Sequence, residues 1–215
     1  MNEQLTIENN SNDEDKGNRL GIEGKFMWPI RLVSVLGFAA TVAINYFVGR
    51  DTGSISDKYR LFVTPPGFFF IIWAVIYTTL AVIVIVNFFK NKWSVKTHIA
   101  FAFSNLFNIL WIIAFGQGNN AGVFSSSFLI LLLAICILLT WTFMGKVEFE
   151  DYGIWNYIER NVFAFYLGWV IAATNLNWGM NIVFWWGATK ETQLIIFWVF
   201  APLCAIGAFG FNIFR

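Results

Sequence analysis

Six long apolar segments constrain what this chain of 215 residues can fold into. Each is about 20 residues long, the length of helix that crosses a bilayer core of about 30 Å. Lipid offers no partners for backbone N–H and C=O groups, so each segment must satisfy them internally as an α-helix. The pattern predicts an all-α integral membrane protein with six transmembrane helices. The segments are Trp28–Val48, Pro65–Phe89, Thr97–Phe115, Ala121–Met144, Asn161–Trp186 and Thr192–Phe214.

The composition is typical of a membrane protein. Hydrophobic residues make up 58% of the chain and charged residues only 13%, against about 25% charged residues in a soluble domain. The formal net charge of +1 argues against a nucleic-acid partner, so the lipid bilayer is the first partner that we expect. The six segments contain no acidic residue. Their one Lys or Arg is Arg31, close enough to its helix start to reach the headgroups.

The remaining sequence predicts tails and connections. Residues 1–26 are polar and acidic and predict a disordered tail. The uncharged turn Gln117–Asn120 predicts an antiparallel hairpin of the third and fourth helices, while Gly49–Thr64 and Gly145–Arg160 predict longer loops. The two cysteines, Cys136 and Cys204, lie in apolar runs without the spacing of a disulfide framework.

Basic residues set the orientation of membrane helices, because loops rich in Lys and Arg stay on the cytoplasmic side. Counted along the six segments, ten basic residues lie on the side of the termini and four on the other. We therefore expect both termini on the cytoplasmic side, or its organellar equivalent. The ten are Lys16, Arg19, Lys25, Arg31, Lys90, Lys92, Lys96, Lys146, Arg160 and Arg215, and the four are Arg50, Lys58, Arg60 and Lys190.

The start of the second segment is the most site-like stretch in the sequence. Pro65-Pro66-Gly67 forms a rigid turn before the helix, and proline is well suited to a first helical turn. Phe69, Trp73 and Tyr77 follow at intervals of four residues, which predicts that they share one helix face.

Amides and indoles inside the segments have two readings. Asn105, Asn108, Asn177 and Asn181 cannot face lipid tails cheaply, so they either join helices or line a pocket that reads a ligand's polar edge. The deep indoles Trp73, Trp111 and Trp169 should face inward, because an indole N–H seeks a partner; core packing and ligand contact explain them equally well. The other marked indoles, at predicted helix ends, are typical of interfacial anchors: Trp28, Trp93, Trp155, Trp185 and Trp186.

Signals for catalysis or metal binding are missing from the sequence. The apolar segments carry no Asp, Glu or Lys, and the single histidine, His98, lies near a helix start without other ligands close in sequence. We expect no catalytic residues, no metal site and no cofactor other than a bound ligand. Rows of small residues, such as Ala201, Ala205 and Ala208, would suit close helix packing within the chain or in a homodimer.

Three stretches together resemble the translocator protein family (TspO/MBR), also called tryptophan-rich sensory proteins or peripheral benzodiazepine receptors. Pro65–Tyr77 is similar to the double-proline, Trp-to-Tyr start of its second helix. Asn105–Trp111 contains the Asn-x-x-Trp of its third helix. Tyr166–Asn177 resembles the fifth-helix signature, Tyr-Leu-x-Trp followed by Ala and Leu-Asn. The resemblance covers roughly residues 28–186.

The resemblance implies a five-helix bundle over residues 27–188, with residues 189–215 as an additional sixth transmembrane helix. Family ligands include porphyrins, sterols and synthetic aromatic drugs, held beneath the loop between the first two helices, and members are often dimeric. The residues that match the family's pocket positions are Trp73, Tyr77, Asn108, Trp111, Trp169, Ala173 and Asn177. We add Phe69 to this ligand-binding set, because its spacing from Trp73 and Tyr77 predicts that it shares their helix face.

Some positions depart from the family pattern. Phe68 stands where shorter members have Trp, and Phe165 replaces a proline before Tyr166. The stretch after Asn177 lacks the aromatic-plus-basic sterol motif proposed for animal members.

The function that we expect is that of a membrane receptor or carrier for a flat hydrophobic ligand of the tetrapyrrole or sterol class. The alternatives are a structural or assembly subunit of a membrane complex and a facilitative transporter. Light-driven porphyrin oxidation, assigned to some relatives, has only the tryptophans in its favour here.

Overall fold

The computed structural model describes residues 27–90, 92–144 and 154–195, and the described residues are helical with no strand. We call the helix over residues 27–48 the N-terminal helix, and residues 190–195 are also helical. The remaining elements are η1 (Gly49–Asp51), α2 (Thr52–Lys58), η2 (Gly67–Ile71), α3 (Ile72–Lys90), α4 (Val95–Phe115), α5 (Asn120–Phe143) and α6 (Ile154–Trp186).

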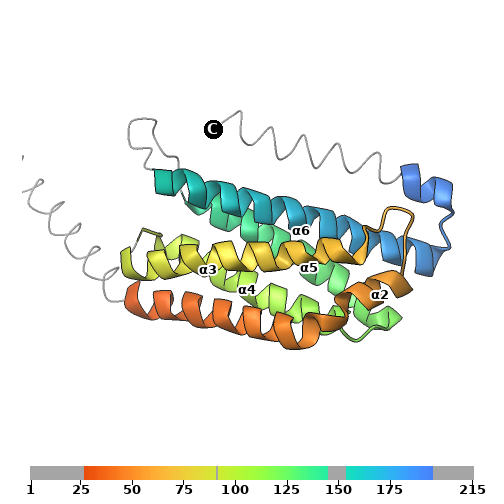
Figure 1. Cartoon of the computed structure of the whole chain (residues 1–215), viewed down its shortest axis with the longest axis horizontal. Helices are drawn as coiled ribbons and strands as arrows, with labels where there is room; N and C mark the ends of the chain where they lie inside the picture. The colour runs from red at the N-terminus through yellow and green to blue at the C-terminus, as the bar shows by residue number, and fades with distance from the viewer. Residues whose placement is uncertain (1–26, 91, 145–153, 196–215) are drawn as a thin grey trace, which may run out of the picture.

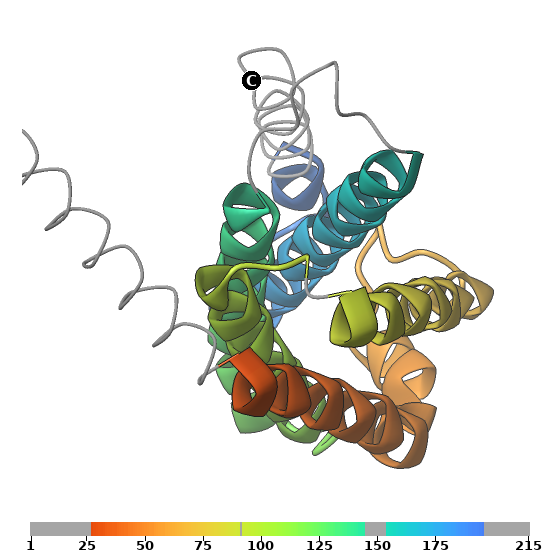
Figure 2. The same cartoon turned by 90° about the vertical axis from the view of Figure 1, so that its left-hand side faces the viewer.

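The long helices of the described residues run side by side along one axis (Figure 1). Seen end-on, they follow one another around the bundle in the order N-terminal helix, α4, α5, α6 and α3 (Figure 2). Hydrogen bonds agree with this order. The N-terminal helix contacts α3 through Arg31 and the Phe88 carbonyl, and it contacts α4 through Ser34 and His98. The core between the helices is mostly aliphatic and aromatic.

Four stretches of the described residues are long and apolar enough to cross a membrane: Met27–Lys58, Gly67–Lys90, Val95–Phe115 and Asn120–Phe143. The outer faces of these helices present large apolar side chains, including Leu36, Ile85, Phe103 and Leu131. A continuous apolar exterior of this kind is unfavourable in water and is the surface that a bilayer requires. The chain is therefore an all-α, multi-pass membrane protein.

The first five predicted helices agree with the structure except at their boundaries. α6 begins at Ile154, seven residues before the predicted start at Asn161. The connection predicted as a loop, Gly49–Thr64, contains the short helix α2, in which Thr52, Ile55 and Ser56 are buried at helical spacing. The predicted disordered tail lies outside the described residues, as does the sixth helix from residue 196 onward.

Helix starts and turns follow from local sequence. Ser94 caps α4 by accepting a hydrogen bond from the Thr97 amide, and Asn119 caps α5 through the Gly122 amide. Between α4 and α5, Gly118 has a φ of 60°, which only glycine adopts at no steric cost. The predicted antiparallel hairpin of α4 and α5 is confirmed.

Two amides fasten α6 to α5. Asn177 Nδ2 donates to Ser126 Oγ, and one turn later Asn181 Nδ2 donates to Ser127 Oγ, each at 2.6 Å. All four side chains are buried. For this pair of helices, the first reading of the intramembrane amides, that they join helices, is the one that the structure supports.

A double-mutant cycle on Asn181→Ala and Ser127→Ala should give a coupling free energy of about 0.6 kcal/mol and no more than about 1.7 kcal/mol, the range for interhelical hydrogen bonds in membranes. Unfolding in mixed micelles would measure it. The unbonded pair Asn181 and Ser126 is the matched control and should couple distinctly less. Equal coupling in both cycles would contradict the assignment.

Candidate functional site

Trp73 of α3 lies at the centre of a group of rings from three helices. Its ring centroid is 5.6 Å from that of Tyr77 in α3 and 5.4 Å from that of Trp111 in α4. It is 6.3 Å from Tyr166 and 6.1 Å from Trp169, both in α6. We call these five residues the aromatic cluster. Their separations fall in the range of favourable ring pairs, so the inward orientation predicted for the three deep tryptophans is confirmed.

The side chain of Asn108 holds this cluster in place. It is fully buried in α4. Its Oδ1 accepts hydrogen bonds from the Tyr77 hydroxyl at 3.2 Å and from Asn45 Nδ2 at 2.7 Å. Its Nδ2 donates to the Tyr166 hydroxyl at 3.0 Å. One amide therefore joins α4 to α3, to α6 and to the N-terminal helix, and it orients two rings of the aromatic cluster.

Two indole N–H groups of the aromatic cluster lack an acceptor. Nε1 of Trp111 and Nε1 of Trp169 are both buried and have no hydrogen-bond partner in the structure. Trp111 is only 3% exposed. A buried donor left unpaired costs about 1–3 kcal/mol, and both donors belong to rings that touch Trp73. Buried polar atoms without a partner also occur elsewhere in the described residues, for example Nε1 of Trp155. What distinguishes Trp111 and Trp169 is that both border the ring of Trp73, where an acceptor on a ligand could meet both donors.

Phe69 departs from the predicted face. Its side chain is 46% exposed, and its ring lies 4.7 Å from that of Phe68. The reason is that residues 67–71 form the 3₁₀ helix η2, with three residues per turn, so the interval of four does not hold there. Phe70, three residues before Trp73, reaches the aromatic cluster instead, with its ring 6.5 Å from that of Trp169.

The two remaining predicted site residues lie further along α6. Ala173 is buried in the core, one turn after Trp169. Asn177 is also buried, and its amide is directed at Ser126 of α5. The structure thus brings Trp73, Tyr77, Asn108, Trp111 and Trp169 together, whereas the donor group of Asn177 is engaged in joining helices.

The connection between the N-terminal helix and α3 is fastened at one end of the bundle. Lys58 Nζ donates to the Gly118 carbonyl at 2.6 Å, and the Tyr59 hydroxyl donates to Asn120 Oδ1 at 2.8 Å. Leu61 is buried against α6 so closely that a Cβ added at Gly179 would lie 2.7 Å from its Cδ1. The connection therefore packs directly on α6 at Gly179, and a larger residue there would require the Leu61 side chain to shift.

Sequence reasoning missed two members of the site region. Tyr166 appeared only as part of the resemblance, although its spacing of three from Trp169 places both on one helix face. Asn45 lies in the N-terminal helix, and the sequence around it has no feature that would have identified it. Its importance arises only from its contact with Asn108.

Trp93 is a correction to the sequence analysis, and His98 near the start of α4 lies beside it. Trp93 was expected to be an interfacial anchor, but it is only 4% exposed, and its indole N–H donates to the carboxyl group of Glu159. His98 is 2% exposed, and its Nδ1 is 2.9 Å from Ser34 Oγ. Trp93 is enclosed because α6 begins before the predicted boundary and brings Glu159 and Phe163 against it, while His98 packs on Trp93 and on Ser34 of the N-terminal helix.

The side chains of the aromatic cluster are suited to binding a ligand. Among the described residues, no three His, Cys, Asp or Glu side chains are grouped so that they could hold a metal ion. The cluster supplies flat ring faces, two hydroxyl groups that are already hydrogen bonded, and two free indole donors. Such a set suits a flat apolar molecule that carries a hydrogen-bond acceptor.

These features define a helical membrane protein with an intramembrane cluster of aromatic and amide side chains. The sequence profile described as TSPO-like protein matches residues 26–212. The chain therefore belongs to the TSPO-like family, and the match extends past residue 186, where the resemblance ended. Searches of curated proteins and of solved structures gave no match.

Replacing Asn108 by Ala should destabilise the protein by about 1–3 kcal/mol, because the buried Tyr166 and the half-buried Asn45 and Tyr77 would each lose a hydrogen bond. Tyr77→Phe, which removes only one of those bonds, should cost about 0.5–1.5 kcal/mol. Unfolding in mixed micelles compares the two variants. The bridging role assigned to Asn108 is wrong if Asn108→Ala costs no more than Tyr77→Phe.

Proposed function

We propose that this protein is a membrane receptor or carrier that binds a flat hydrophobic molecule of the tetrapyrrole or sterol class at the aromatic cluster. The observation that carries the proposal is the pair of buried indole N–H groups, on Trp111 and Trp169, that have no partner and flank the ring of Trp73. Membership of the TSPO-like family supports the same reading.

The rings account for the apolar body of the ligand. Trp73 and Trp169 are packed against the core but remain partly exposed, whereas Trp111 is buried. Large flat side chains from α3, α4 and α6 would offer ring faces and edges to a planar molecule. Each such contact contributes about 0.5–1.5 kcal/mol beyond the burial of apolar area.

The unpaired donors account for a polar group on the ligand. Carboxylate, carbonyl and hydroxyl oxygens can all accept from an indole N–H, and a hydrogen bond to a charged acceptor is worth about 1.5–3 kcal/mol. A porphyrin with carboxylate side chains satisfies both demands, since it combines a planar body with several acceptors. A sterol offers one hydroxyl group and no aromatic face.

The first test is a titration of the purified protein with a dicarboxylic porphyrin, followed by quenching of tryptophan fluorescence. Trp73→Ala/Trp169→Ala should lower affinity about tenfold or more, which corresponds to about 1.4 kcal/mol or more. Trp185→Ala/Trp186→Ala removes two exposed tryptophans and is the matched control, expected to bind like the wild type. Equal affinities for the two double variants would refute the site.

A second test separates hydrogen bonding from packing. Trp111→Phe keeps an aromatic ring and removes one unpaired donor, so affinity for the dicarboxylic porphyrin should fall about 3- to 10-fold, equivalent to a bond of about 0.5–1.5 kcal/mol. Affinity for an alkyl porphyrin without carboxylates should change distinctly less. If Trp111→Phe weakens both porphyrins equally, the indole N–H does not read the ligand.

A further inference from the structure

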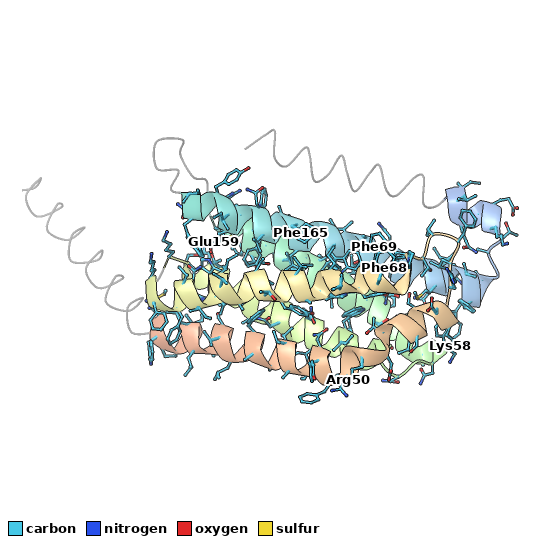
Figure 3. The ribbon with its side chains drawn as sticks, in the orientation of Figure 1. Arg50, Lys58, Phe68, Phe69, Glu159 and Phe165 are labelled. Atoms are coloured by element: carbon cyan, nitrogen blue, oxygen red, sulfur yellow. The ribbon has the colours of Figure 1, made fainter. Side chains whose placement is uncertain are left out.

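Glu159 is a buried acid at the end of the bundle remote from the start of α3 (Figure 3). It lies in α6, two residues before the predicted membrane span, and it is only 5% exposed. Its Oε1 accepts hydrogen bonds from Asn87 Nδ2 at 2.7 Å and from the indole N–H of Trp93. Trp93 belongs to the connection between α3 and α4, so the carboxyl group joins α6 to two neighbouring segments.

No cation is paired with this carboxyl group in the described part of the chain. Lys92 exerts a favourable charge on it, but the Lys92 side chain is exposed, and its Nζ is 3.4 Å from Asn156 Oδ1. The guanidinium group of Arg160 lies over the ring of Trp141 instead.

The two basic side chains on the other side of Trp93, His98 and Arg31, interact with groups other than Glu159. His98 packs its ring 5.2 Å from that of Trp93, and its Nδ1 is bonded to Ser34. Arg31, from the N-terminal helix, acts on His98 and donates to the Phe88 carbonyl. Among the residues that the structure describes, the donors that reach Glu159 are thus neutral ones, an amide and an indole.

A buried carboxylate without a counter-ion is costly, and a carboxyl group in that position holds its proton instead. Both N–H donors act on Oε1, and Oε2 receives no hydrogen bond from a described residue. A neutral acid fits this arrangement, with Oε1 as its carbonyl oxygen and the proton on Oε2. Burial raises the pKa of the Glu159 carboxyl, while the bonds from Trp93 and Asn87 and the charge of Lys92 lower it in part.

We propose that Glu159 is a proton-binding site that, in its protonated form, fastens the start of α6 to α3 and to the α3–α4 connection. Loss of the proton leaves a carboxylate that must recruit water or Lys92, which loosens this junction. The inference is independent of any ligand at the aromatic cluster and can be tested without one.

Infrared spectroscopy tests the proton directly. The difference spectrum of wild type minus Glu159→Gln should contain the carbonyl-stretch band of a protonated carboxylic acid, and the band should persist above about pH 4.3, the ordinary glutamate pKa. The substitution is not expected to unfold the protein, because the amide oxygen of the introduced side chain can accept from both Asn87 and Trp93. Persistence of the band above about pH 4.3 supports the proposal, and its absence or its loss by about pH 4.3 would overturn it.

The dependence of stability on pH gives a second readout. Because the folded-state pKa is raised, the wild type has its full stability below about pH 4.3 and loses part of it as pH rises to the folded-state pKa. Glu159→Gln should lack this decline, whereas Glu191→Gln, at an exposed acid, should retain it. Parallel curves of melting midpoint against pH for wild type and Glu159→Gln would contradict proton binding.

The variant Trp93→Phe tests whether the indole N–H of Trp93 lowers the pKa of the Glu159 carboxyl group. The substitution removes one hydrogen bond to Oε1 and keeps the ring, so the acid band should persist to higher pH than in the wild type. A shift of the band to lower pH would show that Trp93 does not stabilise the carboxylate, and the arrangement proposed here would be wrong.

Discussion

The arrangement of the helices depends on the amide of Asn108. A carboxamide in the interior of a membrane bundle has no water to bind, so every polar atom must find a protein partner. Asn108 finds them in Asn45, Tyr77 and Tyr166, one on each of three other helices. These bonds fix the rotation of α3 and α6 about their axes, and the positions of Trp73 and Trp169 follow from that rotation.

Buried polar groups that join helices differ from those of the candidate site in their hydrogen bonds. The Nδ2 groups of Asn177 and Asn181 donate to Ser126 and Ser127, as expected of side chains that join helices, and only Oδ1 of Asn181 is left without a partner in this pair of described contacts. The indoles of the aromatic cluster belong to the core or pack against it, yet the donors of Trp111 and Trp169 have no partner. Packing alone explains where those rings lie, and it leaves their unpaired N–H groups without an explanation. At the opposite end, the same two helices, α3 and α6, meet again at Asn87 and Glu159.

Much of the fold could be predicted because membrane helices are encoded locally. The length and apolarity of each segment, the Gln117–Asn120 turn and the tryptophan spacing were sufficient for α3, α4 and α5. Boundaries were less predictable, since α6 continues through the polar residues Glu159 and Arg160, which hydropathy assigns to a loop. The site was predicted in part: Trp73, Tyr77, Asn108, Trp111 and Trp169 do meet, but Phe69 does not join them, because a 3₁₀ turn precedes α3.

The sequence by itself determined that the chain spans a membrane as a helical bundle, because bilayer thickness and backbone hydrogen bonding leave no other solution for such segments. It also determined which residue types had to face inward. Only the tertiary structure decided their partners. Both polar side-chain atoms of Asn108 are hydrogen bonded, whereas the indole N–H groups of Trp111 and Trp169 are not, and Glu159 is bonded to Asn87 and Trp93. Hydrogen bonds between helices depend on the rotation and depth of each helix, and neither is encoded in any one segment.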